Sequence, residues 1–378
     1  MSSKIAFVIP SLKKRGGLEK YCIRLAENFS RNNTVSIVTG DCNRSETFPC
    51  ELIELRPFSS MKLARMLSFE LMVKNYFRKT PYDIIFGMDR SFYPQTHHRA
   101  GNGVHAAWLD RRKKLTPWLR GISFALNPFH QLTKAMEQHT FEQVEKLFTN
   151  SHMVKEEVLQ YYPKVTPEKI AVVHNGVEWH ELQKPFEESI SLRKTLIKRY
   201  NLSYDAYQFL FVGNEYLRKG LLLLFRALSL LTDTNFQLSI VGKERNLEFF
   251  KYKAREYGLH EEQVRFFGEA QSAIPFYQIA DCLVIPSLYD PFANVTVEAL
   301  AMGLFVVSSA SNGGSEVITS DDMGLVFHDL MYPDELAHSL WQAMQYPKTA
   351  ESAHNIRHSI KHLDFAQQLQ KFVVEMSR

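Results

Sequence analysis

The sequence has few cysteines, and none of the four forms a C-x-x-C pair. Cys22, Cys42 and Cys50 lie near the start, and Cys282 stands alone in the second half. This spacing lacks the pairing typical of zinc sites and dithiol redox centres. A chain of 378 residues can bury a large core without disulfide bonds. We therefore expect reduced, mostly buried thiols rather than cysteines with a metal or redox role.

Long apolar runs are also missing. The longest candidate, residues 299–307, is half the length that spans a bilayer and contains Gly303. The apolar run 5–9 is too short for the core of a signal peptide. The sequence therefore predicts a cytoplasmic protein that crosses no membrane.

A large excess of one charge is absent as well. The formal net charge is +4, from 45 basic and 41 acidic residues, which excludes a histone-like polycation. Apolar residues make up 45% and charged residues 23%, an ordinary globular composition that argues against disorder. A global sum can still hide a local basic patch.

The dominant pattern is a short apolar run, a turn and an amphipathic stretch, repeated along the chain. Runs of this length, bounded by glycine, proline or asparagine, are typical of strands buried on both faces. Their alternation with helices predicts an α/β fold with parallel sheets. The predicted strands are 5–9, 35–38, 84–86, 146–149, 170–173, 209–212, 238–241, 264–267, 282–285, 305–307 and 325–327.

Eleven strands are many for one sheet, and the chain has a natural seam. After residue 173 comes His174-Asn175-Gly176-Val177, followed by a polar, strand-poor stretch to about residue 207. We predict two Rossmann-like domains, 1–177 and 178–357, that face each other across a central cleft. Ligands of such folds bind at the carboxyl ends of the strands.

In each predicted domain, a glycine-containing turn follows the first predicted strand. Gly16 and Gly17 open a helix, so their backbone could approach an anion, although a simple tight turn explains them equally well. The turn is not G-x-G-x-x-G, so the dinucleotide fingerprint is absent. In the second domain Gly213 precedes Arg218 and Lys219, two adjacent cations that suit a diphosphate; alone, a solvated pair explains them as well.

The most informative segment is 285–303. A strand ends at Pro286, a loop carries Asp290, and a helix is expected from about 292–294, with Glu298 about two turns inside it. The loop carboxylate and Glu298 can bind hydroxyl groups, and the N–H groups at 294–296 can bind phosphate oxygens. This order of hydroxyl, phosphate and hydroxyl contacts fits a nucleotide-sugar, whereas a capped surface helix is the alternative.

These motifs together resemble retaining glycosyltransferases of family 4, which have the GT-B fold. Asp290 and Glu298 match the two acids of the E-x7-E motif, with aspartate in place of the first glutamate. The resemblance implies that Glu298 binds ribose and that Asp290 binds the donor sugar, with donor choice open because aspartate is shorter. It implies a reaction without a metal or cofactor, in which Arg218 and Lys219 hold the diphosphate and the nucleotide-sugar is a substrate. It also implies a C-terminal helix, about 358–378, that returns to the first domain.

The resemblance supplies the full set of expected site residues. The segment 97–109 is similar to R-x-G-x-G-V-H-x-x-x-L of lipopolysaccharide core glucosyltransferases, which places His105 near the transferred sugar. A structural role is the alternative for a single histidine. The expected catalytic residues are Arg218, Lys219, Asp290 and His105. The expected donor-binding residues are Gly16, Gly17, Gly213, Arg218, Lys219, Phe267, Asp290, Asn294, Val295, Thr296 and Glu298.

The segment 99–134 concentrates positive charge. It holds seven basic residues, one acid, Asp110, and the aromatic residues Trp108, Trp118, Phe124 and Phe129. Cations beside aromatics resemble an interfacial membrane-binding surface, and no nucleic-acid-binding module is present. We predict peripheral binding to the anionic inner face of the cytoplasmic membrane. A solvated basic face over a core is the alternative.

The sequence thus predicts a hexosyltransferase that uses a nucleotide-sugar, UDP-glucose being the first donor to test. The expected acceptor is a lipid-linked saccharide of the lipopolysaccharide core, and another cell-surface polysaccharide or glycolipid is the nearest alternative. A nucleotide-dependent oxidoreductase and a non-catalytic sugar-binding protein are the alternatives from other classes.

Overall fold

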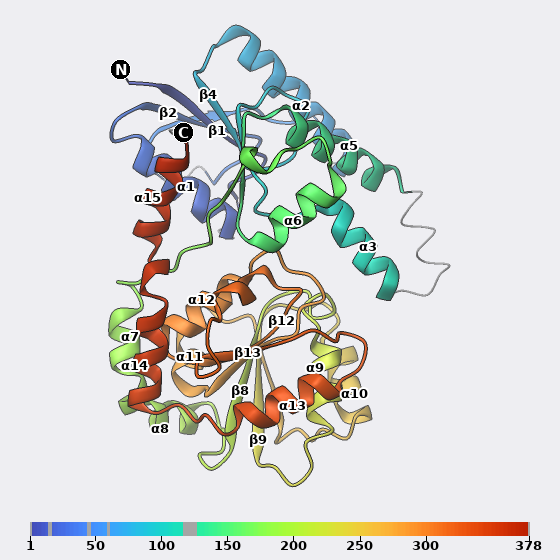
Figure 1. The fold of residues 1–378 in the computed structure, drawn as a ribbon, viewed down its shortest axis with the longest axis vertical. Coiled ribbons are helices and arrows are strands. Elements are labelled where there is room, and N and C mark those ends of the chain that lie inside the picture. Colours follow the sequence, from blue (N-terminus) through green and yellow to red (C-terminus); the bar gives the residue numbers. More distant parts are fainter. Residues whose placement is uncertain (1, 14–16, 44–46, 59–60, 116–126, 377–378) are drawn as a thin grey trace. The chain divides into compact units, whose positions relative to one another are not determined.

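The computed structural model describes residues 2–13, 17–43, 47–58, 61–115 and 127–376. Contacts divide the chain into two compact units. Unit 1 comprises residues 1–173 and 372–378, and unit 2 comprises residues 174–371. Each unit is an α/β structure built on its own parallel sheet (Figure 1).

The sheet of unit 1 has seven strands in the order β3-β2-β1-β4-β5-β6-β7. All of its neighbouring pairs are parallel. Strands β1 and β4 at its centre are mostly apolar on both faces, as expected where helices cover a sheet on two sides. The strands are β1 (Lys4–Ile9), β2 (Thr34–Thr39), β3 (Glu51–Glu54), β4 (Ile84–Gly87), β5 (His97–Arg99), β6 (Lys146–Thr149) and β7 (Ile170–Val172).

The helices of unit 1 connect these parallel strands. They are α1 (Gly17–Phe29), α2 (Lys62–Lys79), α3 (His105–Leu115), α5 (Pro128–Gln143), α6 (His152–Tyr161) and the short η1 (Pro167–Lys169). The last helix, α15 (Phe365–Met376), begins in unit 2 and ends in unit 1. Its Phe372 is fully buried and stacks on Phe148, with ring centroids 4.2 Å apart.

Unit 2 contains a six-stranded parallel sheet in the order β10-β9-β8-β11-β12-β13. Its strands are β8 (Tyr207–Val212), β9 (Phe236–Val241), β10 (Val264–Gly268), β11 (Cys282–Ile285), β12 (Phe305–Ser309) and β13 (Gly324–Phe327). Its helical segments are α7 (Gln183–Glu187), α8 (Ser189–Arg199), α9 (Leu221–Leu228), α10 (Leu247–Glu256), α11 (Ile274–Ile279), α12 (Asn294–Ala301), η2 (Gly313–Val317), α13 (Asp334–Ala343), α14 (Ala350–Ser359) and η3 (Lys361–Leu363).

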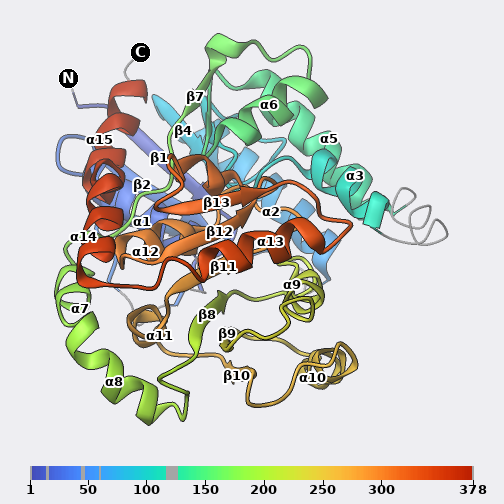
Figure 2. The same ribbon diagram turned by 60° about the horizontal axis from the view of Figure 1, so that its bottom comes forward.

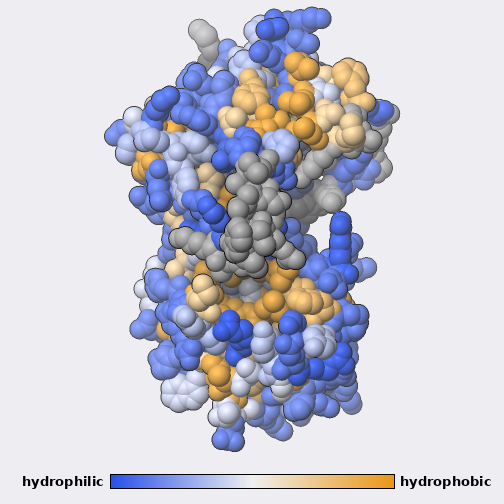
Figure 3. Space-filling view, turned by 90° about the vertical axis from the view of Figure 1, so that its right-hand side faces the viewer, coloured by the Kyte–Doolittle hydropathy of each residue, from blue (hydrophilic) through white to orange (hydrophobic). Residues whose placement is uncertain are grey.

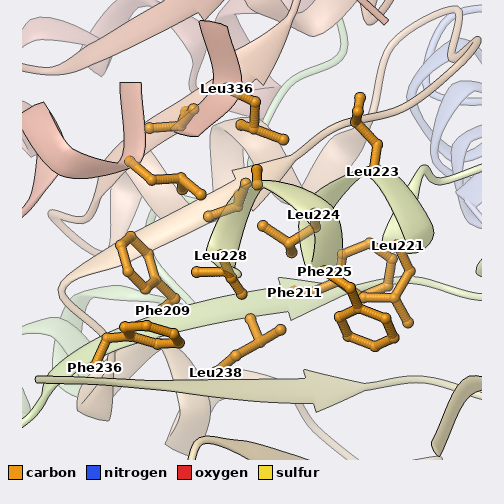
Figure 4. Close-up of a cluster of buried hydrophobic side chains, with 14 of the residues drawn as sticks. Phe209, Phe211, Leu221, Leu223, Leu224, Phe225, Leu228, Phe236, Leu238 and Leu336 are labelled. Atoms are coloured by element: carbon orange, nitrogen blue, oxygen red, sulfur yellow. The ribbon is translucent and has the colours of Figure 1, made fainter. Parts of the chain in front are cut away.

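Two hydrophobic clusters cover the two faces of this sheet. Helices α9, α10 and α13 pack on one face, and α11, α12 and α14 pack on the other (Figure 2). Figure 4 shows the first cluster, in which the leucines of α9 lie over Phe209 and Leu238 of the sheet. Burying a side chain of this size contributes about 1.5–3 kcal/mol, so unit 2 has a large core of its own.

The predicted elements agree with the structure, with two omissions. All eleven predicted strands are present, which confirms the α/β fold with parallel sheets. The structure adds β3 and β5. Strand β3 is a short edge strand, and β5 consists of His97, His98 and Arg99, which are buried although polar. An apolar-run criterion cannot detect either of them.

Within the described residues, no helix combines the length and the apolar composition that crossing a bilayer requires.

Candidate functional site in unit 2

The order of strands in unit 2 reverses between β8 and β11. From β8 the chain passes to β9 and β10 on one side, and β11 to β13 then add on the other side. Open α/β sheets bind ligands at the carboxyl ends of the strands where this reversal occurs. The loop after β8 carries Arg218 and Lys219, and the loop after β11 carries Asp290. Three predicted residues thus follow the two strands at this point.

Backbone contacts hold these two loops together. Gly220 has a left-handed φ of +78°, and a Cβ there would lie 1.8 Å from the Pro286 carbonyl oxygen. Only glycine permits this conformation and this close approach. The Leu288 N–H also donates to the Arg218 carbonyl at 2.9 Å. The positions of the two cations are therefore fixed by the loop that follows β11.

Both cations contact the same carboxylate. Lys219 Nζ donates to Asp290 Oδ2, and Arg218 Nη1 lies 3.4 Å from that oxygen. Arg218 also donates to the Tyr289 carbonyl at 3.0 Å. The side chains of Lys219 and Asp290 are only 12% and 10% exposed. The structure therefore gives Asp290 a role that the sequence did not indicate, as the ion-pair partner of both predicted diphosphate-binding residues.

Asp290 is itself held by backbone hydrogen bonds. Its N–H donates to the Ser311 carbonyl, and its carbonyl accepts from the Gly313 N–H, both at 2.9 Å. Its Oδ1 accepts from the Phe292 N–H at 3.2 Å. A carboxylate offers about four lone-pair sites, so Asp290 keeps acceptor capacity beyond these contacts.

The start of α12 lies next to this loop. Asn294, Val295 and Thr296 form its first turn. The first N–H groups of a helix lack intrahelical partners and attract anions, but the Thr296 N–H already donates to the Ala293 carbonyl at 2.9 Å. Asn294 Oδ1 accepts from Asn175 Nδ2 at 2.6 Å. The structure thus places the three residues predicted for phosphate contacts at a helix N-terminus.

Sequence reasoning missed Asn312. This residue is fully buried, and its Oδ1 accepts from the N–H groups of Ala293 at 2.9 Å and Gly314 at 3.0 Å. Its Nδ2 donates to Thr296 Oγ1 at 3.1 Å. Asn312 therefore joins the loop after β12 to the start of α12. An asparagine directly before two glycines at a strand end is the signal that could have identified it.

Glu298 lies just over one turn inside α12, because the helix begins at Asn294. The expected distance of about two turns was therefore wrong. The Tyr277 hydroxyl donates to Glu298 Oε2 at 2.8 Å. Burial, together with the charge of Glu298, raises the pKa of Tyr277 well above its usual range. The neutral tyrosine therefore holds the Glu298 carboxylate as a hydrogen-bond donor, a contact that the sequence did not predict.

The remaining predicted residues of unit 2 lie near the same edge of the sheet. Gly213 follows β8, and a Cβ on Gly242 would lie 2.0 Å from the Gly213 carbonyl oxygen. The Gly242 N–H donates to the Gly268 carbonyl at 2.7 Å. Phe267 packs its ring against Phe276, with centroids 4.9 Å apart. The Phe267 side chain is thus partly occupied by unit 2, and the main chain of 267–268 lies at the end of β10.

Candidate residues in unit 1

His105 is the first residue of α3, and a buried carboxylate caps this helix. Glu137 of α5 is fully buried and accepts from the N–H groups of His105 at 2.8 Å and Ala106 at 3.3 Å. It also accepts from Arg90 Nε at 2.5 Å and from the Tyr162 hydroxyl at 2.6 Å. Four donors thus fix the carboxylate that sets the position of His105.

The imidazole of His105 lies against a second histidine. Its Nε2 is 3.1 Å from His130 Nδ1, and its ring stacks on Trp108 with centroids 5.6 Å apart. Burial, with the charge of Arg90, lowers the pKa of His105 to about 4. A neutral imidazole donates one hydrogen bond and accepts one, and the role of His105 in the reaction stays a prediction.

The glycine turn and the basic segment are described only in part. Gly16 lies outside the described residues, and Gly17 begins α1. Residues 116–126, which include Trp118 and Phe124, also lie outside them. Arg99 is buried, 5% exposed, with its guanidinium carbon 3.9 Å from the centroid of the Tyr21 ring. Including Arg99 in an exposed basic surface was therefore wrong.

Comparisons with known proteins agree with this architecture. Residues 15–180 match the model described as Glycosyltransferase Family 4, and residues 193–361 match the model described as Glycosyl transferases group 1. An uncharacterized glycosyltransferase of Methanocaldococcus jannaschii is 27% identical over 88% of this chain and 87% of its own length. The lipopolysaccharide glucosyltransferase WaaG of Escherichia coli is 24% identical over 94% of this chain and 93% of its own.

Solved structures show the same fold. The crystal structure of WaaG superimposes with a TM-score of 0.79 and 22% identity, covering 97% of this chain and 98% of that chain. The Anabaena protein HepE in complex with UDP and glucose superimposes with a TM-score of 0.73 and 16% identity, covering 99% of each chain. The two family models together span most of the sequence, and the chain belongs to the family 4 glycosyltransferases with the GT-B fold.

Proposed function

We propose that this glycosyltransferase transfers a hexose, with retention at the anomeric carbon, from a nucleotide-sugar to a lipid-linked saccharide. UDP-glucose is the proposed donor, and a sugar of the lipopolysaccharide core is the proposed acceptor. The observation that carries the proposal is the contact of Arg218 and Lys219 with Asp290 where the strand order of unit 2 reverses. The solved complex of HepE with UDP and glucose supports this choice of donor.

The proposed roles follow from the charges at this site. As the anomeric C–O bond breaks, its electron pair passes to the diphosphate, where negative charge develops. Arg218, Lys219 and the N–H groups of Asn294 and Val295 stabilise that charge from fixed positions. The acceptor oxygen bonds to the anomeric carbon, and its proton passes to the departing phosphate oxygen. No protein nucleophile is needed in this scheme.

In this proposal Glu298 and Asp290 bind the two uncharged parts of the donor, the ribose and the transferred sugar. Glu298, held by the Tyr277 hydroxyl, accepts hydrogen bonds from ribose hydroxyls. Asp290 uses its remaining acceptor capacity for hydroxyls of the transferred sugar while it keeps Lys219 in place. Main chain near Phe267 and Gly213 contacts the base and the phosphates. Gly17 approaches the donor by its backbone, and His105 is the proposed catalytic group of unit 1.

The proposed setting is the inner face of the cytoplasmic membrane. A lipid-linked acceptor would be presented there. The cations of the segment 99–134 are the residues that we propose to contact this membrane. Arg112 stands over the Trp108 ring at 4.9 Å, and Arg111 pairs with Glu157 at 2.7 Å. The proposed partner of this segment, without the buried Arg99, is anionic lipid at the membrane surface.

A panel of UDP-, GDP- and ADP-sugars tests the donor. Slow hydrolysis and thermal-shift stabilisation are measured for each compound with the full chain. The proposal expects the clearest stabilisation and turnover with UDP-glucose, in the presence or absence of EDTA, because two side-chain cations replace a metal. Preferred turnover of a GDP- or ADP-sugar would contradict the donor, and loss of turnover in EDTA would contradict the metal-free reaction.

A further inference from the structure

Unit 2 contains a cavity that is separate from the proposed donor site. Its volume is about 330 Å³, which lies within the range of small-molecule sites. Residues of helix α10, of strand β10 and of the loop between them line it (Figure 2). None of these residues is expected to contact the donor, whose proposed contacts lie at the carboxyl ends of the strands. We call it the α10–β10 cavity.

The turn between α10 and β10 gives this cavity a fixed wall. Just beyond the helix, Gly258 has a left-handed φ of +76°. The Leu259 N–H donates to the Ala254 carbonyl at 3.0 Å. The Val264 N–H donates to the His260 carbonyl, also at 3.0 Å. These backbone bonds tie the loop both to the end of α10 and to the start of β10, so the wall is formed before any ligand binds.

Positive charge predominates on the walls of the cavity. Lys251 and Arg255 lie four residues apart on α10 and therefore share one helix face, and Arg265 comes from β10. The only acid among the lining residues is Glu261, whose side chain is 86% exposed. Figure 3 views unit 2 from the side on which α10 lies in Figure 1, and this face is mainly hydrophilic. The charge of the cavity therefore favours an anion.

The three cations are available to such an anion. Lys251 Nζ lies 2.9 Å from Glu248 Oε1, but that carboxylate is 77% exposed. Arg255 Nη1 lies 4.0 Å from Glu261 Oε1, at the limit of an ion pair. Exposed pairs of this kind contribute little to stability. Within the part of the chain that the structure describes, the Arg265 side chain makes no ion pair and no hydrogen bond.

The dipole of α10 does not explain all of this charge. A helix C-terminus attracts cations, which accounts for Lys253 and Arg255 in the last turn of α10. Arg265 belongs to a strand, so the helix dipole does not account for it. Strand β10 is also an edge strand of its sheet, and alternate backbone N–H groups of an edge strand point away from the sheet. The cavity therefore has hydrogen-bond donors from both the backbone and the side chains.

The floor of the cavity is apolar. Ala254, Leu259 and Val264 line it, are 3–6% exposed and belong to the first hydrophobic cluster of unit 2. Phe266 packs against the same cluster but is only partly buried. An inorganic anion alone would leave this floor without a contact. An organic anion can place its charge on the cations and its body on the floor.

We propose that the α10–β10 cavity binds a phosphate monoester of a small metabolite, as a ligand additional to the donor. The guanidinium groups of Arg255 and Arg265 present paired donors that match phosphate oxygens, and Lys251 adds a third positive charge. The sugar or base that carries the phosphate lies over Phe266. The cavity holds this ligand and takes part in no bond-forming step. The proposal does not depend on the proposed function.

Calorimetric titration of the full chain tests this proposal. The probes are two phosphate monoesters, glucose 1-phosphate and UMP, and a carboxylate, glucuronate. We expect a monoester to bind at least about tenfold more tightly than glucuronate, because a phosphate dianion makes more charge-assisted hydrogen bonds. The monoester that binds more tightly shows whether a sugar or a nucleotide carries the phosphate. Arg255→Ala/Arg265→Ala should weaken this binding about tenfold or more, because it removes both guanidinium contacts.

Two control variants separate the cavity from the donor site. Lys253 lies on the same helix but does not line the cavity, and it pairs with Glu256 at 2.8 Å. Lys253→Ala is expected to leave monoester binding unchanged. Arg218→Ala/Lys219→Ala changes the donor site alone and is expected to retain monoester binding at the cavity. Cooperative thermal unfolding of every variant, at a Tm close to that of the unmodified chain, shows that it is folded.

Four results would overturn the proposal. They are the absence of monoester binding, equally tight binding of glucuronate, unchanged binding in Arg255→Ala/Arg265→Ala, and loss of all monoester binding in Arg218→Ala/Lys219→Ala. Stabilisation by UDP is measured in parallel as the readout of the donor site, and Arg255→Ala/Arg265→Ala is expected to retain it. Failure of UDP to stabilise the unmodified chain would count against the proposed donor and not against the α10–β10 cavity.

Discussion

At the scale of single residues, the site depends on how Asp290 divides its acceptor capacity. The sequence resemblance assigns Asp290 to the donor sugar, and the structure shows it paired with Lys219 and Arg218. Arg218 has a second partner, Glu215, at 2.6 Å, but that carboxylate is 68% exposed. Exposed ion pairs contribute little to stability. A diphosphate can therefore replace Glu215 on Arg218 at low energetic cost, while Lys219 stays anchored to Asp290.

Replacing Lys219 by alanine tests the proposed stabilisation of the leaving group. We expect Lys219→Ala to lower kcat by about 10²–10³-fold, as removal of one fixed charge-stabilising donor does in other enzymes. The measurement is steady-state transfer or donor hydrolysis with saturating nucleotide-sugar.

Lys243 offers a matched control at the same edge of the sheet. It is 67% exposed and pairs with the equally exposed Glu269 at 3.1 Å. Lys243→Ala is expected to keep kcat close to that of the unmodified chain. Near-unchanged turnover of Lys219→Ala, or an equal loss in both variants, would contradict the role assigned to Lys219.

At the scale of elements, the loop after β8 is positioned by the close approach of Gly220 to Pro286. The left-handed φ and the missing side chain are both required at this position. Gly220→Ala is expected to lower the free energy of unfolding by about 3 kcal/mol or more, from backbone strain together with displacement of the Pro286 carbonyl. The two loops would also separate, so kcat should fall with stability. Urea unfolding and steady-state kinetics measure the two effects.

Gly258 serves as a control that separates backbone strain from displacement of the Pro286 carbonyl. Its φ is +76°, and a Cβ there would meet no atom within 4 Å. Gly258→Ala is therefore expected to cost only the conformational part, about 1–2 kcal/mol, with turnover retained. Equal losses of stability in the two variants would show that the contact with Pro286 does not position the loop.

Most elements could be predicted from the sequence because they bury apolar runs. The start of α12, expected at about 292–294, lies at Asn294. The last helix, expected from about 358, begins only at Phe365, because α14 ends at Ser359 and η3 lies between them. The missed strand β5 is polar, and its residues are buried because it pairs with β4 and β6, which only the tertiary structure supplies. For the same reason the contacts of Asn312 and Tyr277 were not predictable. They depend on loops and helices that lie far apart in sequence, and no local spacing reports them.

At the scale of the whole molecule, buried ionisable groups couple stability to pH. His98 is 2% exposed, and burial, followed by the charges of Arg90 and Arg99, lowers its pKa from 6.5 to about 3. As pH falls below 6.5, the unfolded chain takes up a proton that the folded chain does not bind. His98 therefore makes the free energy of unfolding fall as pH drops from 6.5 towards 3, by about 1.4 kcal/mol per pH unit.

Substitution of His98 isolates this contribution. His98→Gln removes the titrating group and keeps a polar side chain beside Gln95, so its stability should depend less steeply on pH below 6.5. His260 is exposed, and His260→Gln serves as the control, with the same pH dependence as the unmodified chain. Urea unfolding at several pH values between 4 and 7 gives the comparison. An unchanged slope in His98→Gln would refute the assignment.

The central claim is that unit 2 binds the diphosphate and the ribose of a nucleotide-sugar where the strand order reverses between β8 and β11. A crystal structure of the full chain with bound UDP tests it most directly. The account predicts diphosphate oxygens within hydrogen-bond distance of Lys219 Nζ and the Arg218 guanidinium, and ribose hydroxyls on Glu298. UDP bound elsewhere, or bound with its ribose away from Glu298 and its diphosphate away from both cations, would contradict the account.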